Sequence, residues 1–320
     1  MTTSHPAPAV PTYTARTPED LLAVVPVVLG FHPQDSVVLL TFGADRPFHA
    51  RVALPTTPAG TDELVEQLVG PCRRHGVRRA VVLVYSGDER SSARAARALV
   101  RGLTTSGVDV LDAIRAHEGR WYVASGPRGA VPEHGVPYDV SVHPFAAQAV
   151  LEGRVTHGSR EALAETVAPD PPAVRAVTEA LAQLPGGAPP VAAERAWAVD
   201  LVARHVRAGS RPSDADVARL VVGMLDVAVR DGAWELMRRD GADRHERFWV
   251  DVVRRTPPGL LAAPAALLAF AAWLAGHGAL AWCALDRCEE AAPGYRLAGY
   301  LAHALTHAVP PTVWDDADAG

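Results

Sequence analysis

The chain has 320 residues, of which 48% are hydrophobic and 21% charged, and its formal net charge is −5. At ~150 residues per domain this length predicts two domains, and the apolar fraction excludes a disordered or collagen-like chain. The slightly acidic balance gives no bulk attraction to nucleic acid or to an anionic membrane, so neither is expected as a partner.

The N-terminal part begins with a leader of residues 1–16, which is rich in Pro, Ala and Thr and lacks the pattern of a signal peptide. We expect this leader to be flexible. The segment Thr17-Pro18-Glu19-Asp20 combines an N-cap hydroxyl with proline and acids in the first turn, which predicts a helix from Pro18 to about Val24. Pro26 should prevent its continuation.

Strands and helices then alternate as far as residue 124. Hydrophobic periodicity predicts strands at 37–42, 48–54, 79–85, 108–114 and 120–124, and helices at 61–75 and 91–105. The first two strands should form a hairpin, and the strand–helix–strand order beyond them implies parallel pairing with right-handed crossovers. Residues 17–144 are therefore expected to form an α/β domain with a mixed sheet.

Almost every signal beyond residue 145 is helical. Helices are predicted at 171–184, 191–208, 214–228, 234–239, 243–255, 264–275, 279–290 and 295–307. Residues 145–314 should form a helical domain, and residues 315–320 a flexible tail. The predicted fold class is thus α/β plus all-α, a mixed α/β sandwich N-terminal domain followed by a helical C-terminal domain.

One uncharged stretch, 259–285, is long enough to cross a bilayer. Its many alanines, Pro264 and the Gly276-His277-Gly278 break instead favour two tightly packed helices of a soluble protein. The three cysteines, Cys72, Cys283 and Cys288, form no C-x-x-C pair. They predict neither a disulfide framework nor a thiolate metal site, and they fit a reducing cytoplasm.

Several motifs resemble one known family. They are LGFHPQDSVVLL at 29–40, FWVDVVRRTPPG at 248–259, LLAFAAWLAGHGALAWCALDR at 267–287 and PGYRLAGYL at 293–301. The chain resembles the DUF4192 family of actinobacteria, whose function is unknown, so the resemblance implies no activity, cofactor or catalytic residue. Many members carry Cys where this chain has Val131, which argues against a thiol or metal role for that loop.

A second resemblance concerns the last helices. Ala281, Leu285, Cys288 and Pro293 have the spacing of the second helix in a tetratricopeptide-type hairpin. Since such scaffolds need about three units, a single hairpin does not establish a repeat array.

The turn from Gly30 to Ser36 is the first candidate site, with His32, Asp35 and Ser36 as its polar residues. A hydrolase would use Ser36 as the nucleophile and His32 as its base. Residues so close in one turn rarely reach triad geometry, and the G-x-S-x-G elbow is absent. We favour a structural role, in which Asp35 and Ser36 satisfy backbone groups of the turn.

The loop from Ser86 to Asp88 is the second candidate, because it follows a predicted parallel strand at the edge where α/β sheets bind ligands. It has no dinucleotide or P-loop motif, so only a generic small-ligand role is predicted, against ordinary loop and cap chemistry.

A third group lies in the helical half. It either lines a groove or forms a helix-end ion pair and core contacts, and it comprises Asp286, Arg287 and the aromatics Trp273 and Trp282. His277, between two glycines, fits a helix–helix corner better than a ligand. His303 and His307 have metal-ligand spacing but lack the Glu of H-E-x-x-H, so no metal is predicted.

Two functions remain open. The first is a non-catalytic, cytoplasmic module that binds a small molecule or a protein, because no coherent catalytic constellation occurs. The second is an enzyme, a hydrolase or a transferase, with its site in a cleft between the two domains. That site would combine the Gly30–Ser36 turn, the Ser86–Asp88 loop and the segment from Gly276 to Arg287. No cofactor is expected, and the sequence gives no oligomeric state.

Overall fold

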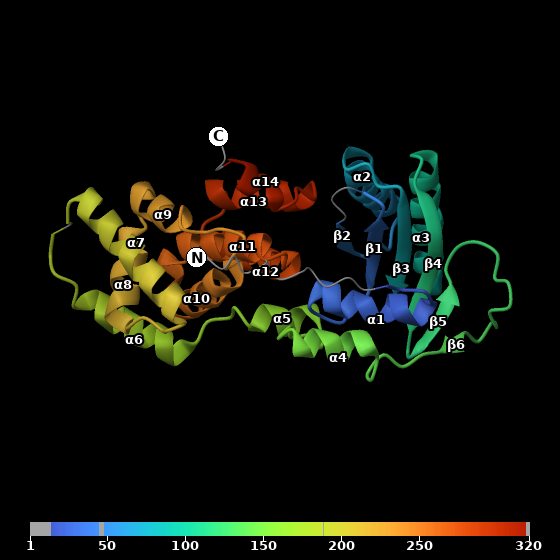
Figure 1. The fold of residues 1–320 in the computed structure, drawn as a ribbon, viewed down its shortest axis with the longest axis horizontal. Helices are drawn as coiled ribbons and strands as arrows, with labels where there is room; N and C mark the ends of the chain where they lie inside the picture. Colours follow the sequence, from blue (N-terminus) through green and yellow to red (C-terminus); the bar gives the residue numbers. More distant parts are fainter. Residues whose placement is uncertain (1–13, 45–47, 188, 318–320) are drawn as a thin grey trace, which may run out of the picture. The chain divides into compact units, whose positions relative to one another are not determined.

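The computed structural model describes residues 14–44, 48–187 and 189–317, so residues 1–13 of the predicted leader and 318–320 of the predicted tail lie outside the described residues (Figure 1). The chain forms two compact units, Met1–Thr156 and His157–Gly320, and each is described by itself. The first contains a mixed sheet and the second is helical, which confirms the predicted fold class.

The sheet of the first unit has the strand order β2-β1-β3-β4-β5-β6. Its strands are β1 (Ser36–Phe42), β2 (His49–Ala53), β3 (Arg79–Tyr85), β4 (Asp109–His117), β5 (Arg120–Val123) and β6 (Val136–Pro137). β3 and β4 are parallel, and the other neighbouring pairs are antiparallel. Both the predicted β1–β2 hairpin and the mixed sheet are confirmed.

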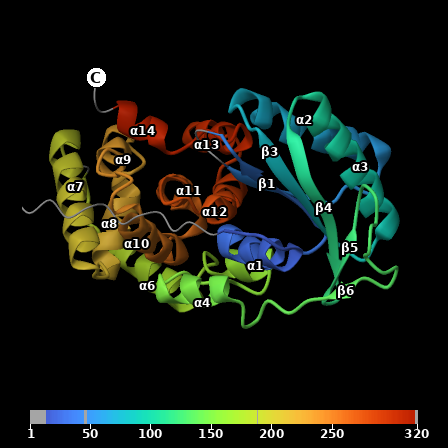
Figure 2. The ribbon, with the colours of Figure 1, turned by 45° about the vertical axis from the view of Figure 1, so that its right-hand side comes forward.

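Helices cover the two faces of this sheet, as Figure 2 shows. α2 (Pro58–Arg74) and α3 (Glu89–Thr105) pack on the face that carries Val37, Val82 and Ala113. α1 (Pro18–Leu29) packs on the opposite face, against Val38 and Leu83. Because side chains alternate along a strand, the nearly unbroken apolar runs of β1 and β3 supply both cores.

The predicted end of the first helix at Val24 is wrong, because α1 continues through Pro26 to Leu29. Thr17 and Asp20 form the expected capping box at its start. Proline inside a helix costs about 3 kcal/mol, and every residue from 22 to 27 is buried, so the core contacts of this segment offset that cost.

Three further boundaries in the first unit differ from the predictions. α2 begins three residues before Thr61, with Thr57 as its N-cap. β4 does not end at residue 114 but continues to His117. Residues 144–151, most of which we expected in the helical domain, form α4 (Pro144–Leu151) in the first unit, where it packs on α1. Just before α4, Nε2 of His143 lies 3.1 Å from the Asp20 carboxylate.

The second unit is a set of packed helices. They are α5 (Arg160–Glu165), α6 (Pro171–Ala182), α7 (Val191–Ala208), α8 (Asp214–Gly223), α9 (Val227–Trp234), α10 (Ala242–Arg255), the 3-10 helix η1 (Pro258–Leu260), α11 (Ala262–Leu274), α12 (Gly278–Ala291), α13 (Arg296–Thr306) and α14 (Thr312–Ala317). α11 is buried along almost its whole length and packs on α10 and α12.

Two of the helices predicted for this unit differ from the structure. The helix predicted at 214–228 is divided, since α8 ends at Gly223 and Asp226 caps α9 through the backbone N–H of Ala228. The helix predicted at 234–239 is absent, because α9 ends at Trp234 and turn residues follow. Residues 315–317 of the predicted flexible tail belong to α14.

The uncharged stretch 259–285 is divided between α11 and α12, as predicted, with Gly276 in a left-handed conformation (φ 81°) between them. Among the described residues, no helix combines the length and the apolar character that a bilayer crossing requires. All three cysteines are buried and unpaired, and burial raises the pKa of Cys72 to about 11.

Candidate functional site

The first two candidate segments meet at one edge of the sheet. β1 begins where β3 ends, so the Gly30–Ser36 turn lies beside the Ser86–Asp88 loop. The Ser86 hydroxyl donates a 2.7 Å hydrogen bond to the Asp35 carboxylate and accepts one from the backbone N–H of Asp88 at 3.1 Å. Asp35 has a positive φ of 39°, which is uncommon outside glycine, and this contact holds its side chain against Ser86.

The other polar residues of these segments have structural partners. The Asp88 side chain caps α3 by accepting from the backbone N–H of Ser91 at 3.0 Å, and hydrogen bonds from Ser91 lower the pKa of Asp88. Ser36 is fully buried and accepts a 2.8 Å bond from Nε of Arg51. Gly30 ends α1 in a left-handed conformation (φ 78°), and His32 is exposed.

This geometry does not form a nucleophile–base pair from Ser36 and His32. The Ser36 hydroxyl donates to the backbone carbonyl of Gln34 and accepts from Arg51, so no described hydrogen bond joins it to His32. We expected Asp35 and Ser36 to satisfy backbone N–H groups of the turn, but neither side chain accepts such a bond among the described residues. Asp35 instead accepts from the Ser86 hydroxyl, and Ser36 bonds to the Gln34 carbonyl and to Arg51.

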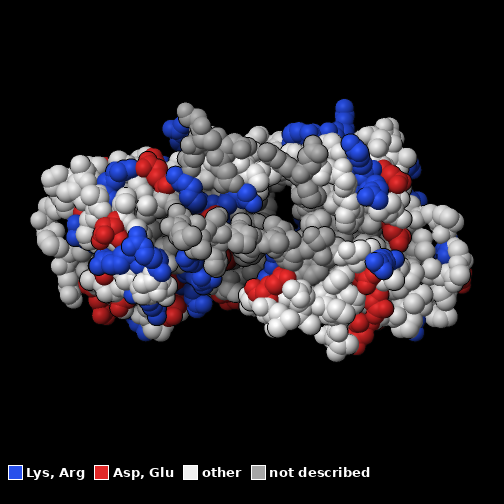
Figure 3. Space-filling model, viewed as in Figure 1, with Lys and Arg blue, Asp and Glu red and all other residues white. Residues whose placement is uncertain are grey.

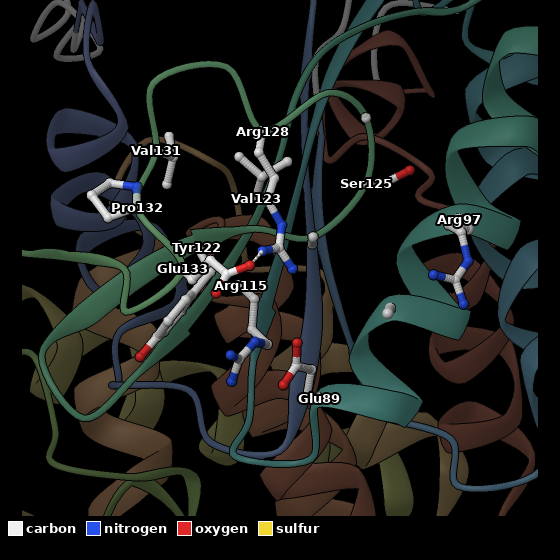
Figure 4. Close-up of a pocket in the computed structure, with 13 residues that line it drawn as sticks. Glu89, Arg97, Arg115, Tyr122, Val123, Ser125, Arg128, Val131, Pro132 and Glu133 are labelled. Carbon is white, nitrogen blue, oxygen red and sulfur yellow. Dashed lines mark hydrogen bonds and ion pairs between the residues drawn. The ribbon is translucent and has the colours of Figure 1, made fainter.

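A pocket of about 290 Å³ lies on the face of the sheet that α2 and α3 cover, beyond the edge of α3 (Figure 4). Its walls are the first turns of α3 and the loop from Ser125 to Glu133, and its floor is formed by β4 and β5. Val131 is one of the lining residues.

Arg115 and Tyr122 form the floor. They are directly opposite each other in the antiparallel β4–β5 pair, so their side chains lie on the same face of the sheet. The guanidinium carbon of Arg115 is 4.1 Å from the centroid of the Tyr122 ring. One Nη of Arg115 donates a 3.3 Å hydrogen bond to the carbonyl of Ser86, which links the pocket to the Asp35–Ser86 contact.

Arg115 is only 8% exposed, yet among the described residues no carboxylate forms an ion pair with it. Buried arginines are normally paired, because removing an unpaired charge from water is costly. Arg255 in the second unit follows that rule, since it is 2% exposed and pairs with Asp214 and Asp251. Arg115 therefore differs from Arg255 in having guanidinium donors that no described acidic side chain uses.

The rest of the pocket carries both signs of charge. Arg97 lines it from α3, and Arg128 and Glu133 form an exposed ion pair of 3.3 Å across the loop. Glu89 lies on α3 and points into the same end of the pocket as Arg115 (Figure 4). On the face of the molecule shown in Figure 3, basic and acidic side chains are similarly interspersed, without one extended patch of a single sign.

The third candidate group and His277 belong to the second unit, where most of these residues have a partner. The indole N–H of Trp273 donates to the carbonyl of Val309 at 3.1 Å, and Nδ1 of His277 lies 2.7 Å from Glu246. Asp286 pairs with Arg160 at 2.7 Å, and Arg287 pairs with Glu290 at 2.9 Å. The predicted enzyme site that combined these residues with the first unit stays a prediction.

His303 of α13 and His307, the C-cap of that helix, lie close together, with their ring centroids 3.9 Å apart. A structural metal site needs about four ligands. Across 14–44, 48–187 and 189–317, no cluster of three or more His, Cys, Asp or Glu side chains is placed to hold a metal ion.

The comparison with protein families gives one result. Residues 18–312 match DUF4192, which is described as a domain of unknown function. The chain belongs to the DUF4192 family. The match spans both compact units, so the α/β unit and the helical unit together make up this DUF4192 domain. Searches of curated proteins and of solved structures found no match.

Sequence analysis missed the pocket of this DUF4192 domain. It found the Ser86–Asp88 loop beside it but not Glu89, Arg97, Arg115 or Tyr122. A signal was present, because Arg115 occurs between apolar residues in Ala113-Ile114-Arg115-Ala116. The predicted strand ended at residue 114 and so left Arg115 outside it. In the longer β4, Arg115 follows Ala113 by two residues, and its side chain therefore lies on the same face of the sheet.

Proposed function

We propose that the first unit is a binding domain for a small organic anion, with Arg115 as the anchor of the anionic group. This function is supported by the environment of Arg115. Its side chain is buried against the Tyr122 ring and lines a pocket, and it has no acidic partner among the described residues. A guanidinium presents a planar fork that matches a carboxylate or a phosphate.

The size of the pocket limits the ligand. Sites for drug-sized ligands occupy about 300–1,000 Å³, and this pocket of about 290 Å³ is at the lower end of that range. If each non-hydrogen atom with its hydrogens takes about 30 Å³, as a water molecule does, the pocket holds a metabolite of roughly ten non-hydrogen atoms. A dinucleotide does not fit.

The test is a thermal-shift titration of the full chain with inorganic phosphate, succinate, glycolate and glycine at millimolar concentrations. A ligand that binds the folded state raises the melting temperature with concentration. We expect at least one of these four ligands, each of which carries an anionic group, to stabilise the wild-type chain and Arg115→Met to abolish that shift. Losing a charged hydrogen-bond pair costs about 1.5–3 kcal/mol, or roughly a ten- to hundredfold loss of affinity.

Arg101→Met is the matched control. Arg101 is exposed on α3 and is not among the pocket-lining residues, so its removal changes net charge equally without touching the site. Equal losses in Arg115→Met and Arg101→Met, or no stabilisation of the wild type by any of the four ligands, would contradict the proposed function.

A further inference from the structure

Besides Arg115, the pocket contains two charged side chains that form no ion pair among the described residues, Arg97 and Glu89. Glu89 is the first residue of α3, and its carboxylate is exposed toward the pocket. Among the described residues, Glu89 forms no ion pair and accepts no side-chain hydrogen bond. The N-cap of α3 is Asp88, so Glu89 is not needed to cap the helix.

Glu89 and Arg115 come from different elements and point into the same end of the pocket (Figure 4). They carry opposite charges, yet they are not within ion-pairing distance of each other. Arg115 is held away by the Tyr122 ring on one side and by the Ser86 carbonyl at 3.3 Å. Each of the two groups therefore retains hydrogen-bonding capacity that the other does not use.

This arrangement discriminates between classes of anion. A ligand that carried negative charge alone would gain from Arg115 and be repelled by Glu89. A ligand that carried an ammonium group beside its anionic group would pair with both. Ala93, one helical turn beyond Glu89, is the next lining residue of α3, and its small side chain leaves room at this wall.

We infer that the ligand is a small zwitterion of the amino-acid type, whose carboxylate meets Arg115 and whose ammonium group meets Glu89. The inference rests on the proposed function, because it uses the same pocket and the same anchor. It adds Glu89 as the residue that selects an amine over a hydroxyl. The volume of about 290 Å³ accommodates a free amino acid.

The experiment compares ligands that differ only in the group facing Glu89. Isothermal titration of the full chain uses glycine against glycolate, L-alanine against L-lactate, and L-glutamate against L-2-hydroxyglutarate. We expect at least one amino acid to bind about tenfold or more tightly than its hydroxy acid, as a charge-assisted contact implies.

Glu89→Gln should remove that advantage by weakening the amino acid and leaving the hydroxy acid equal or tighter. Glu63→Gln is the control, since Glu63 is exposed on α2 and does not line the pocket. Because Glu89 is exposed and unpaired, its replacement is not expected to unfold the chain.

The outcomes separate this inference from the proposed function. Equal binding of amino and hydroxy acids, or an advantage that survives Glu89→Gln, overturns the zwitterion inference, while loss of both ligands in Arg115→Met still supports anion binding. An amine advantage that is insensitive to Arg115→Met overturns both. If no amino acid and no hydroxy acid binds, the zwitterion inference fails, and the phosphate and succinate titrations decide the proposed function.

Discussion

The guanidinium of Arg115 lies over the ring of Tyr122, directly across the β4–β5 pair, at 4.1 Å from Cζ to the ring centroid. The contact fixes a side chain that would otherwise have many rotamers, and it shields one face of the cation from water. Arg115 is thereby oriented toward the pocket before any ligand arrives.

Replacing Tyr122 by leucine should weaken ligand binding without removing the cationic anchor, Arg115. A cation–π contact contributes about 0.5–2 kcal/mol, so we expect roughly a 2- to 30-fold higher Kd in Tyr122→Leu. Tyr122→Phe keeps the ring and should stay close to the wild type. Titration of both variants with the anion that binds the wild type best checks this, and an equal loss in the two would show that the hydroxyl rather than the ring matters.

Gly135 lies close to the same Tyr122 ring. Its φ is +73°, and an added Cβ would lie 2.6 Å from the Tyr122 ring and 2.9 Å from the backbone oxygen of Trp121. Gly129 has φ +54° with open space around its Cβ position. Gly129→Ala should cost about 1–2 kcal/mol of unfolding free energy from the left-handed backbone alone.

Gly135→Ala should cost clearly more than Gly129→Ala and should also reduce anion affinity, because the ring under Arg115 must move. Urea denaturation of the two variants measures the difference in stability. Identical midpoints for both would mean that the ring yields to the added methyl without cost.

The layers of the fold followed from hydrophobic patterning because the pattern there was unambiguous. The run at 79–85 forms β3, whose residues 80–84 are buried. The Thr17 cap and the glycine at 209 set helix boundaries correctly. The pattern failed where tertiary packing overrides local rules. Pro26 stays helical because its neighbours are buried, and a capping aspartate, Asp226, divides a stretch with continuous helical periodicity.

The site was predictable only in part. The sheet-edge rule identified the loop at Ser86, and the structure brings it to Asp35 as well as to Arg115. The pocket itself depends on the pairing of β4 with β5 and on the loop from Ser125 to Glu133. The sequence of that loop has no hydrophobic periodicity from which its conformation could be predicted. Nothing in the spacing of Glu89 and Arg115, 26 positions apart in sequence, shows that they share one pocket.

Ser86→Ala should lower stability by about 1–3 kcal/mol. The variant removes the buried hydroxyl that donates to Asp35 and accepts from the N–H of Asp88. Ser125→Ala, in the loop that lines the pocket, changes a partly buried serine that has no described side-chain hydrogen bond and should be near neutral. Chemical denaturation compares the two, and a neutral Ser86→Ala would mean that water replaces the hydroxyl.

The stability of the second unit should depend on pH because of His245. Burial, with a smaller contribution from Arg244, lowers the pKa of His245 from 6.5 to about 4. The unfolded chain therefore binds a proton between pH 6.5 and 4 that the folded chain does not, so stability is full above pH 6.5 and falls as the pH drops through this window. The loss is up to about 3 kcal/mol, at 1.36 kcal/mol for each unit of pKa.

His245→Phe should flatten that part of the pH profile, because the variant has no group to protonate. The free energy of unfolding in urea, measured at pH 7 and at pH 5 for both chains, gives the comparison. An unchanged difference between the two pH values in His245→Phe would assign the dependence to other groups.

Observation of the Arg115 side chain during a titration tests anion binding at the pocket most directly. In a ¹⁵N-labelled chain, the Nε–H signal of Arg115 is assigned by its absence from Arg115→Lys. This signal should shift and saturate with the same concentration dependence as the thermal stabilisation by the bound anion. A ligand that stabilises the chain while the Arg115 signal stays unmoved would show that binding occurs elsewhere and would contradict the account.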